Sequence, residues 1–148
     1  MARRPEQARK SVKDHLEDLL KGHREAAFSG PESALKYLRR TLEGQTSLPN
    51  AVKAVAYDVV ADAEAQLQNW EAADEAVKRV LANLTSMEVD LGHGYRARLE
   101  AMTCFERGIQ ARSELGDFHG ALELCEIAIE LNLGAHYMAK RDSLDWAR

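Results

Sequence analysis

Residues 105–129 read FERGIQARSELGDFHGALELCEIAI and contain two apolar runs separated by a glycine. In both runs the apolar residues recur every three or four positions, which is the period of an α-helix. Gly116 is typical of the end of a helix, and Asp117 is a preferred residue at the start of the next one. This stretch therefore predicts two antiparallel helices joined by a tight corner.

The same period extends over most of the 148 residues. It predicts seven helices, at about 12–28, 32–43, 50–67, 71–84, 95–115, 117–132 and 135–147. Neither alternating strand patterns nor Asn-Gly turns occur, so the sequence lacks the signals of β-hairpins. Residues 85–94, which include Gly92 and Gly94, are the longest predicted break and are expected to form a loop. We therefore expect an all-α protein.

The predicted helices pair into hairpins that share residue types at matching positions. An aromatic or proline at the corner is followed three residues later by alanine and seven residues later by a core residue. These positions are Phe118, Ala121 and Cys125 in the last hairpin, Trp70, Ala73 and Val77 in the middle one, and Pro31, Ala34 and Leu38 in the first. A mid-helix glycine costs roughly 1 kcal/mol relative to alanine. We expect close packing to explain Gly22, with Gly22 and Ala61 lying against Ala34 and Ala73.

This pattern resembles the tetratricopeptide repeat (TPR), a helical hairpin that stacks on further copies of itself. The resemblance implies stacked antiparallel hairpins, a TPR-like α-solenoid, with about three degenerate repeats at 15–48, 54–87 and 102–133. A capping helix at 135–147 would cover the last hairpin. The repeat spacing is irregular, and a plain helix bundle is the alternative. We expect residues 12–148 to form one domain, preceded by a basic arm at 1–11.

Charge is distributed unevenly along the chain. Residues 1–13 carry five basic residues against Glu6, a net charge of +4, which leaves −8 for the rest because the whole chain has −4. An acidic body argues against nucleic-acid binding, which needs a basic face. A nucleic-acid binder stays as an alternative in which the basic arm acts together with Lys36, Arg39 and Arg40.

The remaining sequence signals concern location and chemistry. No apolar run is long enough to cross a membrane, and Cys104 and Cys125 fit no zinc or disulfide framework, so we expect a cytoplasmic protein. His15 and His23 are eight residues apart rather than at the spacing of four typical of helical metal ligands. No phosphate-binding loop or activated nucleophile is apparent. We expect neither an enzyme nor a metal or cofactor site.

The TPR resemblance implies a concave face, lined by the first helix of each hairpin, on which a peptide is held. The partner-binding residues carried over by position are Leu16, Leu19, His23, Asp58, Asp62, Gln66, Glu106, Gln110 and Glu114. One subset of the family clamps a terminal carboxylate, which Asp58 and Asp62 would repel. Complementarity instead favours a basic or amphipathic protein or peptide, although these residues are also consistent with a merely solvated helix face.

The hypothesis from the sequence is a protein–protein interaction module, either an adaptor or scaffold or a chaperone-like binder, that grips a peptide or helix in this groove. The alternative is a regulatory or homo-oligomerisation domain, because a fold does not by itself determine function.

Overall fold

The computed structural model describes residues 11–44 and 47–147, and every regular element within them is helical. These elements are α2 (Val12–Ala27), α3 (Pro31–Gly44), α4 (Asn50–Gln66), α5 (Trp70–Ala82), α6 (Leu84–Leu91), the 3-10 turn η1 (Gly92–Gly94), α7 (Tyr95–Ala101), α8 (Cys104–Glu114), α9 (Phe118–Glu130) and α10 (His136–Ala147). The expected all-α class is confirmed for these residues. Of the predicted basic arm, residues 1–10 lie outside the described part.

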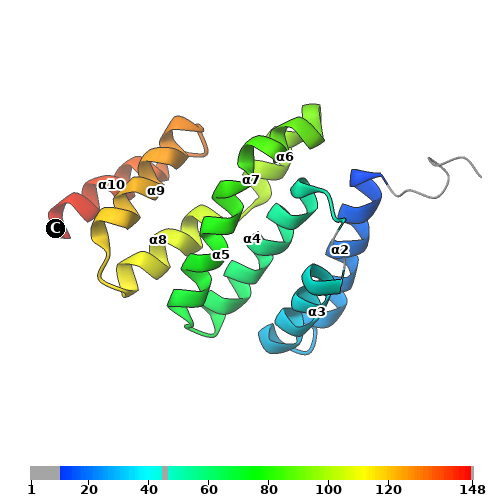
Figure 1. Ribbon diagram of the computed structural model, residues 1–148. Helices are drawn as coiled ribbons and strands as arrows, with labels where there is room; N and C mark the ends of the chain where they lie inside the picture. Colours follow the sequence, from blue (N-terminus) through cyan, green and yellow to red (C-terminus); the bar gives the residue numbers. More distant parts are fainter. Residues whose placement is uncertain (1–10, 45–46, 148) are drawn as a thin grey trace, which may run out of the picture.

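The helices form a row that runs from α2 and α3 at one end to α10 at the other (Figure 1). Three pairs, α2 with α3, α4 with α5 and α8 with α9, are hairpins of consecutive helices in contact. The first helices of neighbouring hairpins also contact one another, since α2 packs on α4 and α4 packs on α8. This arrangement places α2, α4 and α8 along one face.

Each hairpin turns at a residue with positive φ. These residues are Gly30 (φ 107°), Gln68 (φ 60°) and Gly116 (φ 79°). Glycine tolerates this conformation without a Cβ clash, which accounts for two of the three corners. Asp117 then caps α9 as predicted, because its carboxylate accepts a hydrogen bond from the Gly120 amide at 2.9 Å.

The prediction of a loop at 85–94 is wrong, because most of this segment is helical. α6 covers Leu84–Leu91, and its Met87 is fully buried in the core shared by α2, α3 and α4. Burial of one apolar face stabilises a short helix that its own sequence signals only weakly. The two glycines do break the helix, but only at η1.

The prediction of one continuous helix at 95–115 is also wrong. The chain leaves the helical conformation at Met102 (ψ 152°), and α8 begins at Cys104. The Thr103 amide donates a hydrogen bond to Asp58 Oδ1 on α4 at 3.0 Å. The carboxylate thereby satisfies one of the free amides at the start of α8, so a residue from another helix sets where α8 begins.

Small residues do allow close helix packing. A Cβ added to Gly22 would lie 2.2 Å from the Tyr37 hydroxyl oxygen, so this glycine makes room for the Tyr37 side chain of α3. The core residues predicted seven positions after the corner residues, Leu38, Val77 and Cys125, are all fully buried.

Candidate functional site

Asp62 on α4 joins three helices of the shared face. Its carboxylate accepts hydrogen bonds from Arg107 Nε on α8 and from Gln66 Nε2, both at 2.8 Å. His23 on α2 is close enough for Asp62 to act on its protonation, although burial is the larger effect and lowers the pKa of His23. Hydrogen bonds therefore join polar groups of α4 and α8 in one network, and His23 of α2 lies within electrostatic range of it.

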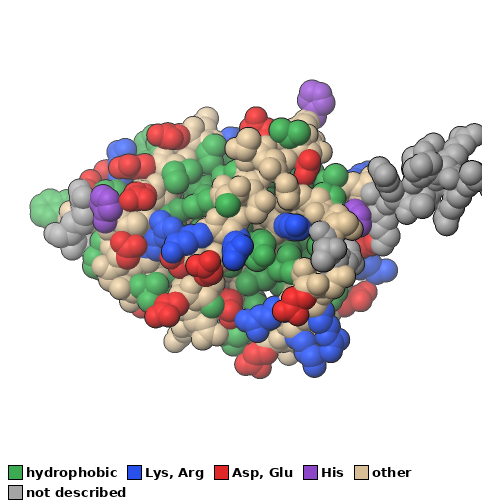
Figure 2. All heavy atoms as spheres, in the orientation of Figure 1, with side chains coloured by type: hydrophobic (Ala, Val, Ile, Leu, Met, Phe, Trp, Pro, Cys, Tyr) green, Lys and Arg blue, Asp and Glu red, His purple; other side chains and the backbone are tan. Residues whose placement is uncertain are grey.

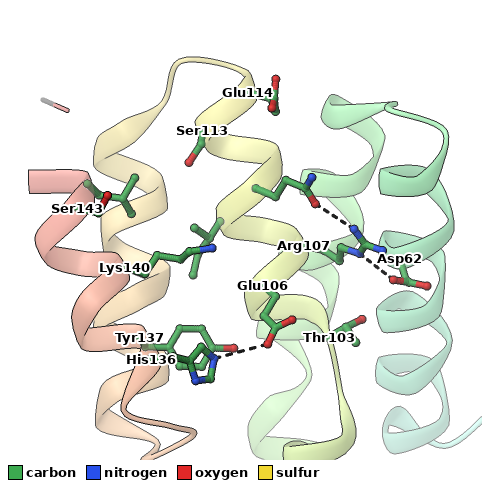
Figure 3. A pocket seen from close by; sticks show the side chains of 13 residues that line it. Asp62, Thr103, Glu106, Arg107, Ser113, Glu114, His136, Tyr137, Lys140 and Ser143 are labelled. Carbon is green, nitrogen blue, oxygen red and sulfur yellow. Dashed lines mark hydrogen bonds and ion pairs between the residues drawn. The ribbon is translucent and has the colours of Figure 1, made fainter. Parts of the chain in front are cut away.

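A cleft of about 540 Å³ lies beside this network, between α8 and α10 (Figure 3). Its apolar floor consists of Ile109, Tyr137 and Leu144, which are 2%, 5% and 8% exposed. The polar residues that line it are Asp62, Thr103, Glu106, Arg107, Gln110, Ser113, Glu114, His136, Lys140 and Ser143. A volume within roughly 300–1,000 Å³ is typical of clefts that hold a small ligand.

Two interactions fix the polar wall of the cleft. Arg107 Nη1 donates to Gln110 Oε1 at 3.0 Å, so the guanidinium that binds Asp62 also orients the Gln110 amide. At one end of the cleft, His136 Nε2 on α10 lies 3.6 Å from Glu106 Oε1 on α8. Figure 3 shows this pair bridging the two helices below Lys140. The wall is thus preorganised on α8, and the exposed His136–Glu106 contact reaches across to α10.

The structure brings some of the predicted partner-binding residues together and buries others. Asp62, Glu106, Gln110 and Glu114 line the cleft. His23 and Gln66 lie next to it through their interactions with Asp62. By contrast, Leu16, Leu19 and Asp58 are 8%, 2% and 6% exposed and belong to the interior. Asp58 points towards the start of α8 and offers its carboxylate to backbone amides there.

The wall that α10 contributes was not predicted from the sequence. His136, Tyr137, Lys140, Ser143 and Leu144 all face the cleft, whereas the sequence pattern predicts only a capping role for the last helix. Their spacing of about three and four was a signal for one helix face. Arg107 was also missed, because the inner positions follow the repeat pattern and that pattern passes over residue 107.

These additional residues change the charge expected for the groove. The sequence predicts a groove that is apolar at one end and acidic in the middle, but Arg107 and Lys140 add positive charge beside Asp62, Glu106 and Glu114. On the face that Figure 2 shows, acidic and basic side chains are interspersed with apolar atoms. The site therefore has mixed charge and an apolar centre.

The described residues contain few groups suited to other chemistry. No cluster of three or more metal-ligating side chains occurs among residues 11–44 and 47–147. Cys104 and Cys125 are free thiols and fully buried. Burial raises the pKa of both thiols, and most strongly that of Cys104, which disfavours the reactive thiolate. Among the helices of the described part, none has the length and apolarity needed to cross a membrane.

Comparisons of the chain with protein families, with curated proteins and with solved structures gave no significant match.

Proposed function

We propose that this protein is a protein–protein interaction module that holds a segment of a partner in the cleft between α8 and α10. The observation that carries the proposal is the combination of a buried apolar floor with a fixed polar rim. The rim is held in place by Arg107, which binds both Asp62 and Gln110. A surface that is ordered before binding loses less entropy when a partner docks.

We also propose that the helices form a TPR-like stack with α10 as its capping helix. The contacts of α2 with α4 and of α4 with α8 support this proposal, since successive first helices line one face in such a stack. The matching corners at Gly30, Gln68 and Gly116 support it as well. In this arrangement the module would serve as an adaptor, scaffold or chaperone-like binder. A cytoplasmic location is consistent with the two free thiols.

A cleft-blocking variant tests the binding function. Ser143 is exposed on α10 and lines the cleft, so Ser143→Trp fills the cleft without altering the core. Ala82→Trp places the same side chain at an exposed position at the end of α5, away from the cleft, and is the matched control. In pull-downs from cell lysate, wild type and Ala82→Trp should retain the same partner protein, and Ser143→Trp should not retain it. Equal capture by all three folded proteins would refute the assignment of the cleft.

Self-association is a second candidate function, favoured by the outer side of α10. Trp146 is 91% exposed and Met138 is 49% exposed on this last helix of the row. Tryptophan and methionine are enriched in protein–protein interfaces relative to the rest of the surface. Sedimentation velocity at increasing concentration should then detect a dimer that Trp146→Ser weakens. A monomer at every concentration would eliminate this candidate.

A further inference from the structure

Part of the charge around the cleft is already paired within the protein. Asp62 Oδ1 binds Arg107 Nε at 2.8 Å, and Glu106 Oε1 lies 3.6 Å from His136 Nε2, a contact that is an ion pair only when the imidazole is protonated. The first contact connects α4 to α8 and the second connects α8 to α10, so both hold side chains of the cleft wall in position. Paired charges of this kind offer little additional attraction to an incoming ligand.

Two residues of opposite sign in the cleft, Lys140 and Glu114, have no oppositely charged neighbour in the part of the chain that the structure describes. In the described residues, no oppositely charged group pairs with the Lys140 ammonium or with the Glu114 carboxylate. Both residues are exposed and line the same cleft. Figure 3 shows Lys140 extending from α10 towards α8 near the middle of the view. Glu114 lies at the upper end of α8 in the same view, and Ser113 lies below Glu114 and above Lys140. The cleft therefore presents one free positive and one free negative charge at separate places.

An apolar floor lies between these charges and the core. Ile109 on α8 and Tyr137 and Leu144 on α10 provide it. An apolar side chain placed on this floor would leave water, while the residues on either side of it would stay at the charged rim. A basic flanking residue would be repelled by Lys140, and an acidic one would be repelled by Glu114. The rim therefore selects the sign of each flanking residue.

We propose that the cleft recognises a peptide segment in which an apolar side chain lies between an acidic and a basic residue. The acidic residue pairs with Lys140 and the basic residue with Glu114. The inference rests on the proposed binding function and names the chemistry of the partner segment. Because Lys140 and Glu114 have opposite signs, the segment needs one flanking residue of each sign.

Four synthetic peptides with acetylated and amidated ends test this selection. Each carries a central leucine on an alanine and glycine background, flanked by Asp and Arg in either order, by two Asp residues or by two Arg residues. Both mixed orders are needed because, in one chain direction of binding, they place Asp and Arg at opposite positions of the cleft. Titration calorimetry should show one mixed peptide binding about tenfold more tightly than either like-charged peptide. Amide chemical-shift changes should lie on α8 and α10.

A double charge exchange provides the decisive variant. Glu114→Lys combined with Lys140→Glu should reverse the preference, so that the other mixed peptide binds more tightly. Glu17→Lys combined with Lys21→Glu makes the same exchange at two exposed positions of α2 outside the cleft, and should leave the preference unchanged.

The outcomes separate this inference from the proposed function. Equal binding of mixed and like-charged peptides, or a preference that does not reverse in the cleft variant, overturns the inference. The inference also fails if no peptide binds while Ser143→Trp still abolishes capture of a partner, and the binding function then stands. If the peptides fail and Ser143→Trp also has no effect, both proposals fall.

Discussion

The carboxylate of Asp58, in the middle of α4, accepts a hydrogen bond from the backbone amide of Thr103 at 3.0 Å, across 45 positions of sequence. The same carboxylate interacts with the amide and thiol of Cys104. Asp58 is only 6% exposed, so a buried acid on one helix defines the start of the helix that forms the wall of the cleft. Stability and the shape of the cleft are therefore connected through this contact.

The first prediction concerns the pH dependence of stability. Burial raises the pKa of Asp58 from 3.8 to about 7, against the opposing hydrogen bonds from Thr103 and Cys104. Between about pH 4 and pH 7 the folded protein holds a proton that the unfolded chain has released. The free energy of unfolding due to Asp58 therefore falls as the pH rises through this window. One pKa unit corresponds to about 1.4 kcal/mol, so the decline is roughly 4 kcal/mol.

Urea unfolding of wild type and Asp58→Asn at several pH values measures this effect. Asparagine keeps an oxygen acceptor for Thr103 but does not titrate in this range. The stability of the variant relative to wild type should therefore increase between pH 4 and pH 7. Asp142→Asn changes the same charge at an exposed position of α10 and is the control. If the free energies of unfolding of wild type and Asp58→Asn changed in parallel with pH, Asp58 would not titrate as described.

A second prediction concerns the glycine at the centre of the last hairpin. A Cβ at Gly108 would lie 2.7 Å from Leu124 Cδ1 and 2.9 Å from Val77 Cγ1. Alanine has the higher helix propensity, but this contact forces side chains of α5 and α9 to move. We expect Gly108→Ala to lower the free energy of unfolding by about 1–2 kcal/mol. Gly44→Ala has no neighbouring atom within 4 Å and should not destabilise. If Gly108→Ala and wild type had equal free energies of unfolding in denaturant titrations, the close approach of Leu124 and Val77 to Gly108 would be contradicted.

A third prediction concerns the ion pair that joins α5, α8 and α9. Arg112 Nε binds Asp74 Oδ1 at 2.7 Å, and Arg112 Nη1 donates to the Gly120 carbonyl at 2.8 Å. Arg112→Ala leaves both acceptors without this donor in a mostly buried place, so we expect a loss of about 3 kcal/mol. Arg79→Ala removes an exposed arginine that pairs with Glu75 and should change stability by less than about 0.5 kcal/mol. Thermal unfolding that ranks these two variants the other way would reject the assignment.

A fourth prediction concerns the two thiols. Cys104 and Cys125 are buried, and burial raises the pKa of each. A thiol reagent that attacks thiolates should therefore modify the folded protein at least about a hundredfold more slowly than the protein in denaturant. In the single variants Cys104→Ser and Cys125→Ser only one thiol remains, so the modification rate measured for each variant belongs to that thiol. Rapid modification of either cysteine without unfolding would mean that the site opens locally.

The helix pattern predicted much of the fold because it depends on short-range physics. The period of apolar residues identified the all-α class, and Gly116 with Asp117 marked a corner that the structure contains. Burial of Leu38, Val77 and Cys125 also followed from their positions on helix faces. These features depend on residues a few positions apart, and those relations are visible in a sequence.

The candidate site was only partly predictable because its geometry depends on distant residues. The repeat pattern identified Asp62, Glu106, Gln110 and Glu114, which do line the cleft. It also selected Asp58, whose side chain is turned inward to the start of α8. The wall from α10 could not be derived, because the way in which the last helix packs depends on the whole of α9 and not on a local pattern.

The sequence by itself determined that this chain is helical, where most helices lie and which faces are apolar. Those properties come from propensity and periodicity, which act within a few residues. Only the tertiary structure decided that residues 84–91 are a helix, that α8 begins at Cys104 and that Arg107 and Lys140 face one cleft. The physical reason is that burial, charge pairing and close contact are set between residues far apart in the chain, and folding alone brings those residues together.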